Sequence, residues 1–408
     1  MAQLTNTSHS IHNTMTTEKT IRKHVIQYLC DKGYEKSQIK EDHKISYLDM
    51  SNHDAQITFD IAVLDEKGDV CEFYEIKPKG VTSGDLKKHS KKFEILHDFI
   101  EFASIITRGA LGFLVTYDSK KKDFELYLIT EEISSLAKYV EVVMRVASTK
   151  SGFTNYYRGQ GNIEFSLLPG LYRKPSTPAK ELELYKEATR RCPDDFQGLD
   201  STFQHLVKLQ HYGIPTRLLD LTSNALIALY FAVEKKEYKD LKTKKTAMDA
   251  VVFVFTVDNK TIKSYDSDAV SVISNLARVK SFEMPKTAIS IEDFNDLNDT
   301  CLLLHEIRYE KPHFQPVIDP TELNKTLCVK PKLENSRIRQ QSGAFFLYGI
   351  GGNKNTCSSL AEHPINIVIE SKYKDKLKKE LACFGITDSY VYPEMDHVMS
   401  TIKEEYKV

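Results

Sequence analysis

The sequence predicts a protein of mixed α/β and α+β class built from two units. Helical apolar stripes alternate with extended runs up to about residue 135. From Tyr156 onward this pattern gives way to aromatic-rich loops and longer helical stretches. The chain has 408 residues, of which 41% are hydrophobic and 28% charged, enough for two or three hydrophobic cores. We therefore expect a mobile tail at 1–16, a first unit at 17–135, a linker helix at 136–150 and a second unit at 151–408.

The first unit is predicted to hold two helices and four strands. Apolar residues three and four apart indicate the helices, and period-two alternation indicates the strands. The expected segments are a helix at 17–30, a hairpin of strands 56–64 and 70–76, a second helix from 84 to about 103, strands 110–117 and 124–129, and a linking helix at 132–148.

Later in the chain, helices are expected at 179–191 and 200–211, and the lysine-dominated segment 234–246 is expected to be a solvated loop without function.

Charge, cysteines and hydropathy exclude several classes of protein. Lys and Arg number 56 and Asp and Glu 57, so any contact with nucleic acid must come from a local patch. The seven cysteines are scattered and never spaced as CxxC, which argues against disulfides and zinc and favours a reducing cytoplasm. The longest apolar run, Ala225–Val233, is about half the ~18 residues of a membrane helix. We expect a cytoplasmic protein without a membrane partner.

Asp60, Glu75 and Lys77 place charge inside the predicted hairpin. Glu75 and Lys77 are two residues apart on one strand, so their side chains leave the same face of the sheet, with Asp60 on the neighbouring strand. Two such carboxylates can share a Mg²⁺ ion, and a lysine beside them can assist an attacking water. Alternatively, Glu75 and Lys77 form an ordinary exposed cross-strand pair.

The same residues resemble the PD-(D/E)xK nuclease signature, over roughly residues 17 to 130, in the form found in type I restriction enzymes. Phe59 stands where that pattern often has proline. The resemblance implies a restriction-endonuclease-like mixed sheet flanked by helices. It also implies that Asp60 and Glu75 hold Mg²⁺ and that Lys77 takes part in cleavage. A degenerate member would keep the shape and only bind nucleic acid.

A second set of motifs begins at Tyr157-Arg158-Gly159 and resembles the start of the FRG domain. Further motifs of the same family follow in order at 168–173, 210–220, 228–232 and 337–346. Physically, Arg158 offers a planar cation, and Gly159 allows a ligand to approach the backbone. A polar strand end at 220–223 feeds a helix N-terminus, which favours anions. The alternative for Arg217 and Asp220 is that they pair with each other in a buried turn.

The order of these motifs is similar to that of ADP-ribosyltransferases, which implies a split sheet and an NAD site. In that family the arginine holds NAD and a third motif supplies a catalytic glutamate on a strand. Here the third motif has glutamines instead, which favours NAD binding over transfer. The resemblance implies a catalytic position for Gln341. The residues expected to bind the nucleotide are Tyr157, Arg158, Gly159, His211, Tyr212, Asp220, Thr222, Tyr230 and Gln340.

Together these patterns predict a two-domain cytoplasmic effector of antiviral or toxin-like type. The first unit would cleave or bind nucleic acid with Mg²⁺, and the second would bind NAD, with ADP-ribosyl transfer or NAD cleavage as the reaction. The alternative is a non-enzymatic sensor of nucleic acid and a nucleotide ligand. In either case Arg158, His211, Asp220 and Gln341, far apart in sequence, should line one cleft.

Overall fold

A computed structural model of the chain gives the fold. It describes residues 20–32, 34–48, 54–77, 111–118, 123–128, 132–147, 151–234, 248–287, 289–350 and 364–406. The predicted tail, the second expected helix and most of the lysine-dominated segment lie outside these residues.

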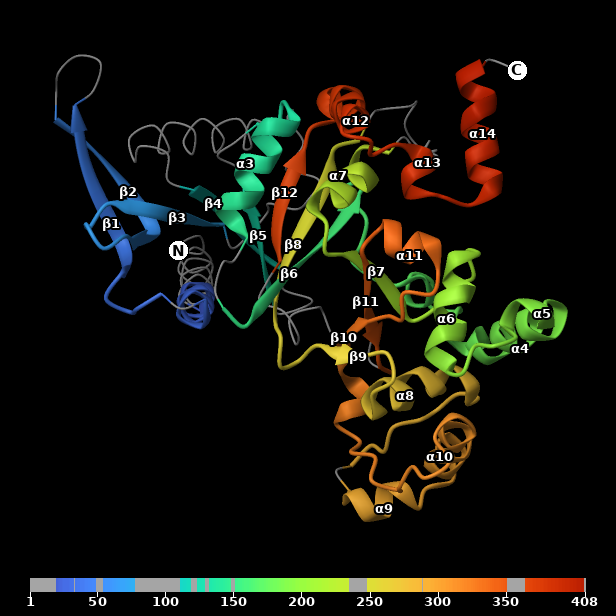
Figure 1. The fold of residues 1–408 in the computed structure, drawn as a ribbon. Helices are drawn as coiled ribbons and strands as arrows, with labels where there is room; N and C mark the ends of the chain where they lie inside the picture. Colours follow the sequence, from blue (N-terminus) through green and yellow to red (C-terminus); the bar gives the residue numbers. More distant parts are fainter. Residues whose placement is uncertain are drawn as a thin grey trace, which may run out of the picture.

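The described strands form one mixed sheet of twelve strands (Figure 1). Its order is β1-β2-β3-β4-β5-β12-β8-β6-β7-β11-β10-β9. The strands are β1 (Ile39–Leu48), β2 (Asp54–Leu64), β3 (Val70–Lys77), β4 (Leu111–Asp118), β5 (Asp123–Leu128), β6 (Phe153–Gln160), β7 (Leu218–Thr222), β8 (Ala250–Asp258), β9 (Lys263–Ser264), β10 (Thr326–Lys330), β11 (Gly343–Tyr348) and β12 (Ile365–Ile369).

The mixed α/β class is confirmed, and so are the predicted elements of the first unit that lie in the described part. Residues 20–31 are helical, β2 and β3 form the antiparallel hairpin, and β4 and β5 follow as expected. β1 was not predicted; it pairs antiparallel with β2 at the edge of the sheet. A nuclease-like arrangement of this unit stays a prediction.

The two predicted units share the sheet through β5 and β12. These strands pair in parallel, with Ile365 opposite Leu126, and β12 then pairs antiparallel with β8. One hydrophobic cluster accordingly spans both units on one face of the sheet. Helix α3 (Leu136–Val146), expected as a linker, contributes five buried residues to it, and the Tyr139 hydroxyl donates a hydrogen bond to the carbonyl of Ala225 at 2.8 Å.

Helices cover this sheet and extend beyond it in the second unit. They are α4 (Glu181–Arg191), α5 (Pro193–Phe196), α6 (Thr202–His211), α7 (Ala225–Val233), α8 (Asp268–Asn275), α9 (Ile291–Asn295), α10 (Asn298–Glu310), α11 (Ser336–Gln340), α12 (Lys374–Cys383), α13 (Asp388–Val391) and α14 (Met395–Tyr406). Short 3-10 turns lie at Gly170–Tyr172, Pro178–Lys180, Leu276–Arg278, Glu322–Asn324 and Ser371–Tyr373.

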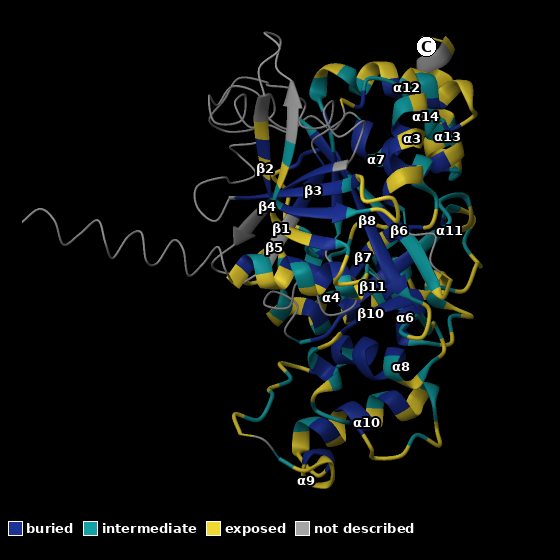
Figure 2. Cartoon of the chain, turned by 90° about the vertical axis from the view of Figure 1, so that its left-hand side faces the viewer, coloured by how far each residue is buried: buried dark blue, intermediate teal, exposed yellow. Residues whose placement is uncertain are grey.

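Three hydrophobic clusters pack the helices against the central strands. Helices α7 and α12 join α3 on the first face, and a second cluster covers the opposite face of the sheet. A third cluster lies among α4, α6, α8 and α10 and includes residues of β10 and β11. The central strands β7, β8 and β11 are buried almost throughout (Figure 2). Among the described helices, none combines the length and apolar character that a membrane crossing requires.

Candidate functional site

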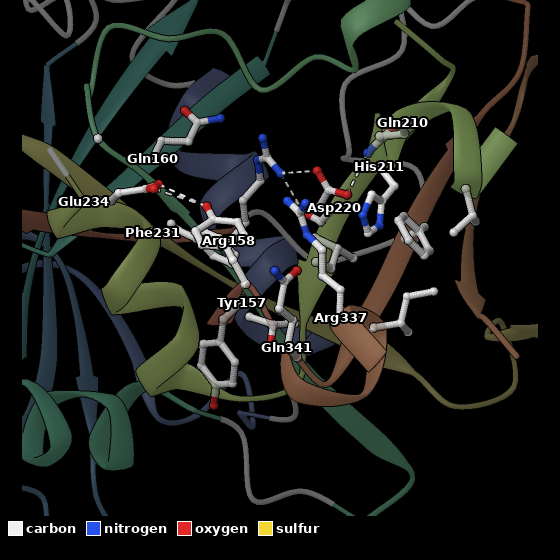
Figure 3. Close-up of a pocket in the computed structure, with 18 of the residues that line it drawn as sticks. Tyr157, Arg158, Gln160, Gln210, His211, Asp220, Phe231, Glu234, Arg337 and Gln341 are labelled. Atoms are coloured by element: carbon white, nitrogen blue, oxygen red, sulfur yellow. Dashed lines mark hydrogen bonds and ion pairs between the residues drawn. The ribbon is translucent and has the colours of Figure 1, made fainter. Parts of the chain in front are cut away.

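A cavity of about 470 Å³ opens where β6, β7, α6, α7 and α11 meet (Figure 3). Its walls combine charged, amide and aromatic side chains from segments far apart in the chain. The lining residues are Tyr157, Arg158, Gly159, Gln160, Gly161, Phe165, Arg173, Val207, Gln210, His211, Asp220, Leu221, Thr222, Phe231, Glu234, Arg337, Ile338, Gln341, Phe345 and Tyr392.

Arg158 is held in the middle of the cavity by its strand and by Asp220. β6 lies between β8 and β7 in the sheet, which fixes the direction of the side chain. The Arg158 Nη1 donates to the backbone carbonyl of Asp220 at 2.7 Å and lies 3.8 Å from its Oδ2. Gln210 Nε2 donates to the other Asp220 oxygen at 2.6 Å. The guanidinium is thus oriented, and the carboxylate of Asp220 is largely exposed.

His211, the last residue of α6, joins the cavity to the C-terminal segment. Its Nε2 lies 2.9 Å from Oε1 of Glu394, and its Nδ1 lies 3.1 Å from the amide nitrogen of Asn335. A neutral ring that donates from Nε2 and accepts at Nδ1 fits both contacts. Burial, and after it the charge of Arg337, holds the pKa of His211 below its usual range, although Glu394 acts in the opposite direction.

Arg337 and Glu234 lie on either side of the Tyr392 ring. The guanidinium carbon of Arg337 is 4.7 Å from the centre of this ring, a cation–π contact. The Tyr392 hydroxyl donates to the two carboxylate oxygens of Glu234 at 3.2 and 3.3 Å. Burial, and after it the negative charge of Glu234, holds the pKa of Tyr392 above its usual range, although the charge of Arg337 acts in the opposite direction. The cavity therefore carries a cation and an anion separated by one aromatic side chain.

The predicted convergence of the second set of motifs is confirmed. Arg158, His211, Asp220 and Gln341 all line the cavity, although 183 residues separate the first from the last. Tyr157, Gly159 and Thr222 line it as well. The binding or catalytic roles of these residues stay predictions.

Three residues expected to bind the nucleotide do not line the cavity. Tyr212 is 70% exposed and packs beside Lys208 on the outer side of α6. Tyr230 is fully buried behind the cavity, where its hydroxyl donates to Asp388. Gln340 ends α11 and does not reach the lining, unlike its neighbour Gln341.

Gly159 and Gln341 have structural tasks that the sequence analysis did not foresee. A Cβ on Gly159 would lie 1.8 Å from the carbonyl oxygen of Ala228, so glycine is needed for the close approach of β6 and α7. Gln341 follows α11 rather than lying on a strand, and its amide donates to the carbonyl of Val391 at 3.0 Å. The Thr222 hydroxyl donates to the Gln341 carbonyl at 2.6 Å.

The alternative pairing of Arg217 with Asp220 is wrong. Arg217 is buried, and its Nε donates to Glu181 Oε1 at 2.9 Å while its Nη1 donates to the carbonyl of Tyr348 at 3.0 Å. Asp220 instead faces Arg158. The helix N-terminus after Asp220 is capped by Asn224, whose side chain accepts from the amide of Leu226, and α7 lines the cavity with its C-terminal end.

Five polar residues of the cavity were not predicted as site residues: Gln160, Arg173, Gln210, Glu234 and Arg337. Gln160 directly follows the Tyr157-Arg158-Gly159 motif on β6, and Arg337 is the first residue of the third motif. Both could therefore have been found from the motifs themselves. Glu234 was assigned to a solvated loop because lysines dominate the residues after it. Its position directly after the apolar helix was the signal that could have found it.

The structure describes the side chains of two of the three predicted nuclease residues, Asp60 and Glu75. Asp60 accepts from Arg22 Nη2 at 2.7 Å and from the backbone amide of Ile76 at 2.8 Å. Glu75 is buried with 6% exposure, so it does not belong to an exposed cross-strand pair. Lys77 ends β3, and its side chain lies outside the described part of the structure. The catalytic and metal-binding roles of these residues stay predictions.

Within the described ranges, no group of three or more His, Cys, Asp or Glu side chains is arranged to hold a metal ion. The carboxylate of Asp60 is engaged by a guanidinium and by the next strand. Asp60 and Glu75 would therefore bind Mg²⁺ only together with ligands from elsewhere, such as water or phosphate oxygens.

A comparison with known families identifies the segment that supplies most of this cavity. Residues 154–241 match the FRG domain. The FRG segment, as we call residues 154–241, includes Arg158, Asp220 and Glu234, whereas Arg337 and Tyr392 lie beyond it. No curated protein and no solved structure gave a significant match to the chain. The cavity is thus completed by residues outside the matched segment.

Proposed function

We propose that the FRG segment and the C-terminal residues around it bind a nucleotide of the NAD type in this cavity. The observation that carries the proposal is that three guanidinium side chains from separate parts of the chain line one cavity: Arg158 from β6, Arg173 and Arg337. Guanidinium groups bind phosphate oxygens with two parallel hydrogen bonds, so this convergence favours a ligand with a diphosphate.

The remaining walls support a nucleotide rather than a simple anion. A volume of about 470 Å³ falls within the range of small-molecule sites, ~300 to 1,000 Å³. Aromatic side chains such as Phe165, Phe231 and Tyr392 offer faces for a base to stack on. The amides of Gln160, Gln210 and Gln341 offer donors and acceptors for ribose hydroxyls and base edges.

The reaction that we propose for such a site is cleavage of the bond between nicotinamide and ribose, by transfer to an acceptor or by hydrolysis. A carboxylate near that bond stabilises the positive charge that develops on the ribose. Gln341 cannot supply it, but Asp220 and Glu234 both line the cavity. Release of nicotinamide from NAD is measured over hours with the purified full chain. Release would support an enzyme, whereas binding without release would indicate a sensor.

Calorimetric titration of NAD and of ADP-ribose into the full chain tests the binding proposal. We expect both to bind, and Arg158→Ala to weaken both about ten- to a hundredfold, because a charge-assisted hydrogen bond contributes ~1.5 to 3 kcal/mol. Arg190→Ala is the matched control, since Arg190 is exposed on α4 and contacts only Glu187 among its described ion pairs.

The Arg190→Ala variant should bind both ligands as the unmodified chain does. Absence of heat with both ligands at millimolar concentration would reject the proposal. So would equal binding by the unmodified chain and Arg158→Ala.

A further inference from the structure

Helix α14 carries an apolar stripe that the described part of the chain leaves largely exposed. This helix follows the short helix α13 near the C-terminal end and lies away from the sheet (Figure 1). Four large apolar side chains on it are between 39% and 75% exposed: Met395, Met399, Ile402 and Tyr406. A single exposed apolar residue is ordinary, but a row of four on one helix indicates a surface that a partner covers.

The spacing of these four residues is that of a coiled-coil seam. They follow one another at intervals of four, three and four positions, which are the successive d, a, d and a positions of a heptad. The stripe therefore stays on one side of α14 over its 12 residues, a length of about 18 Å. Such a narrow seam suits a second helix better than a lipid surface, which takes a broader apolar face.

A second copy of α14 has the spacing that this seam requires. If two α14 helices run in opposite directions about a two-fold axis, Met395 of each lies opposite the partner's Tyr406, and Met399 lies opposite the partner's Ile402. The flexible methionine side chains can adapt to the ring of Tyr406 and to the branched chain of Ile402. The whole stripe is then covered on both copies.

The charges beside the stripe favour this antiparallel orientation. Asp396 and Lys403 are both exposed, and both occupy the e position of the heptad, which flanks the seam. In the antiparallel pair, Asp396 and the partner's Lys403 are offset by two residues, about 3 Å along the helix axis. The two-fold axis repeats the contact, so two pairs of opposite charge form. In a parallel pair equal residues lie level, which separates these charges by seven positions.

We propose that α14 joins two copies of this chain in an antiparallel, two-fold symmetric dimer. Each copy contributes one short helix, which is at the low end of interface sizes, so the dimer is reversible and depends on protein concentration. The contact begins next to the cavity, because Glu394, which contacts His211 there, directly precedes Met395. The proposal does not depend on which ligand the cavity binds.

Sedimentation velocity of the full chain, at concentrations on the order of 1 to 100 µM, tests the proposal. We expect the mass to rise with concentration from the 46.7 kDa of one chain toward twice that value. Ile402→Asp places a charge in the seam and should keep the chain monomeric. Ser400→Asp changes an exposed residue of α14 outside the stripe and is the matched control, which should dimerise as the unmodified chain does. Circular dichroism should show that both variants are folded.

Two charge reversals test the orientation of the helices. Asp396→Lys and Lys403→Asp each bring like charges together at both contacts of the antiparallel dimer. Each variant alone should therefore dimerise about tenfold more weakly than the unmodified chain. An equimolar mixture of the two variants should dimerise as tightly as the unmodified chain, because each copy then meets opposite charges on its partner.

Three results would overturn the proposal. The first is the mass of one chain at every concentration, whether or not the chain then sediments with phosphatidylcholine vesicles. The second is a dimer that survives Ile402→Asp, which would place the contact elsewhere. The third is a dimer that tolerates both charge reversals, or one that their mixture does not restore, since either contradicts the antiparallel pairing. The nucleotide site is tested separately, because no residue of the stripe lines the cavity.

Discussion

Removing one partner of the buried ion pair between Arg217 and Glu181 should strongly destabilise the folded chain. The side chains are 4% and 10% exposed, and the guanidinium also donates to the carbonyl of Tyr348 in β11. Glu181→Leu would leave the guanidinium buried without its carboxylate. Breaking one side of a buried pair costs about 3 to 5 kcal/mol, so we expect the free energy of unfolding to fall by that amount.

Urea unfolding followed by circular dichroism measures this change. The double variant Arg217→Met with Glu181→Leu should recover most of the loss, because an apolar pair of similar volume replaces the ion pair at little net cost. Glu187→Gln removes an exposed carboxylate from the same helix and should leave the urea midpoint unchanged. A loss below about 1 kcal/mol for Glu181→Leu would refute the claim that this pair is tightly buried.

Three further predictions concern pH, packing and the first unit. Burial lowers the pKa values of His205 and His211, so the folded chain binds protons less readily than the unfolded chain. The free energy of unfolding should therefore be highest above about pH 6.5 and should fall as the pH drops below that value. Urea midpoints measured at pH 7.5 and 5.5 would show this difference. Gly159→Ala should prevent native packing of β6 on α7, seen as loss of soluble folded protein, and normal folding would contradict the 1.8 Å approach. If the first unit is a Mg²⁺-dependent nuclease, Asp60→Asn and Lys77→Ala should abolish cleavage of plasmid, linear DNA or RNA, whereas equal cleavage by the variants would exclude these residues as catalytic.

The sequence predicted elements well where burial leaves a periodic signal. β2 alternates buried and exposed residues in its first half, and the turn at 65–69 that joins it to β3 is short, so the hairpin could be predicted although β3 is packed on both faces. β1 was missed because it lies at the edge of the sheet, and its residues Ile39–Leu48 include several charges that suit an exposed strand. The pairing of β5 with β12 joins residues more than 230 positions apart, and no local pattern encodes such a pairing.

The residues of the candidate site that could be predicted are those that lie within the sequence motifs. Arg158 and Asp220 could be named because each lies within a recognised motif. Tyr230 was named for the same reason, yet its motif serves packing, since the ring is fully buried. Glu234 was missed because the lysines after it indicated a solvated loop, whereas the proximity of the end of α7 to Tyr392 places this residue in the cavity.

An experimental structure of the full chain with ADP-ribose tests most directly whether this cavity binds a nucleotide. We expect the diphosphate in the cavity, within hydrogen-bond distance of the guanidinium groups of Arg158 and Arg337. Density for the ligand elsewhere, for instance in the groove between α4 and α6, with this cavity empty, would contradict the proposed nucleotide site.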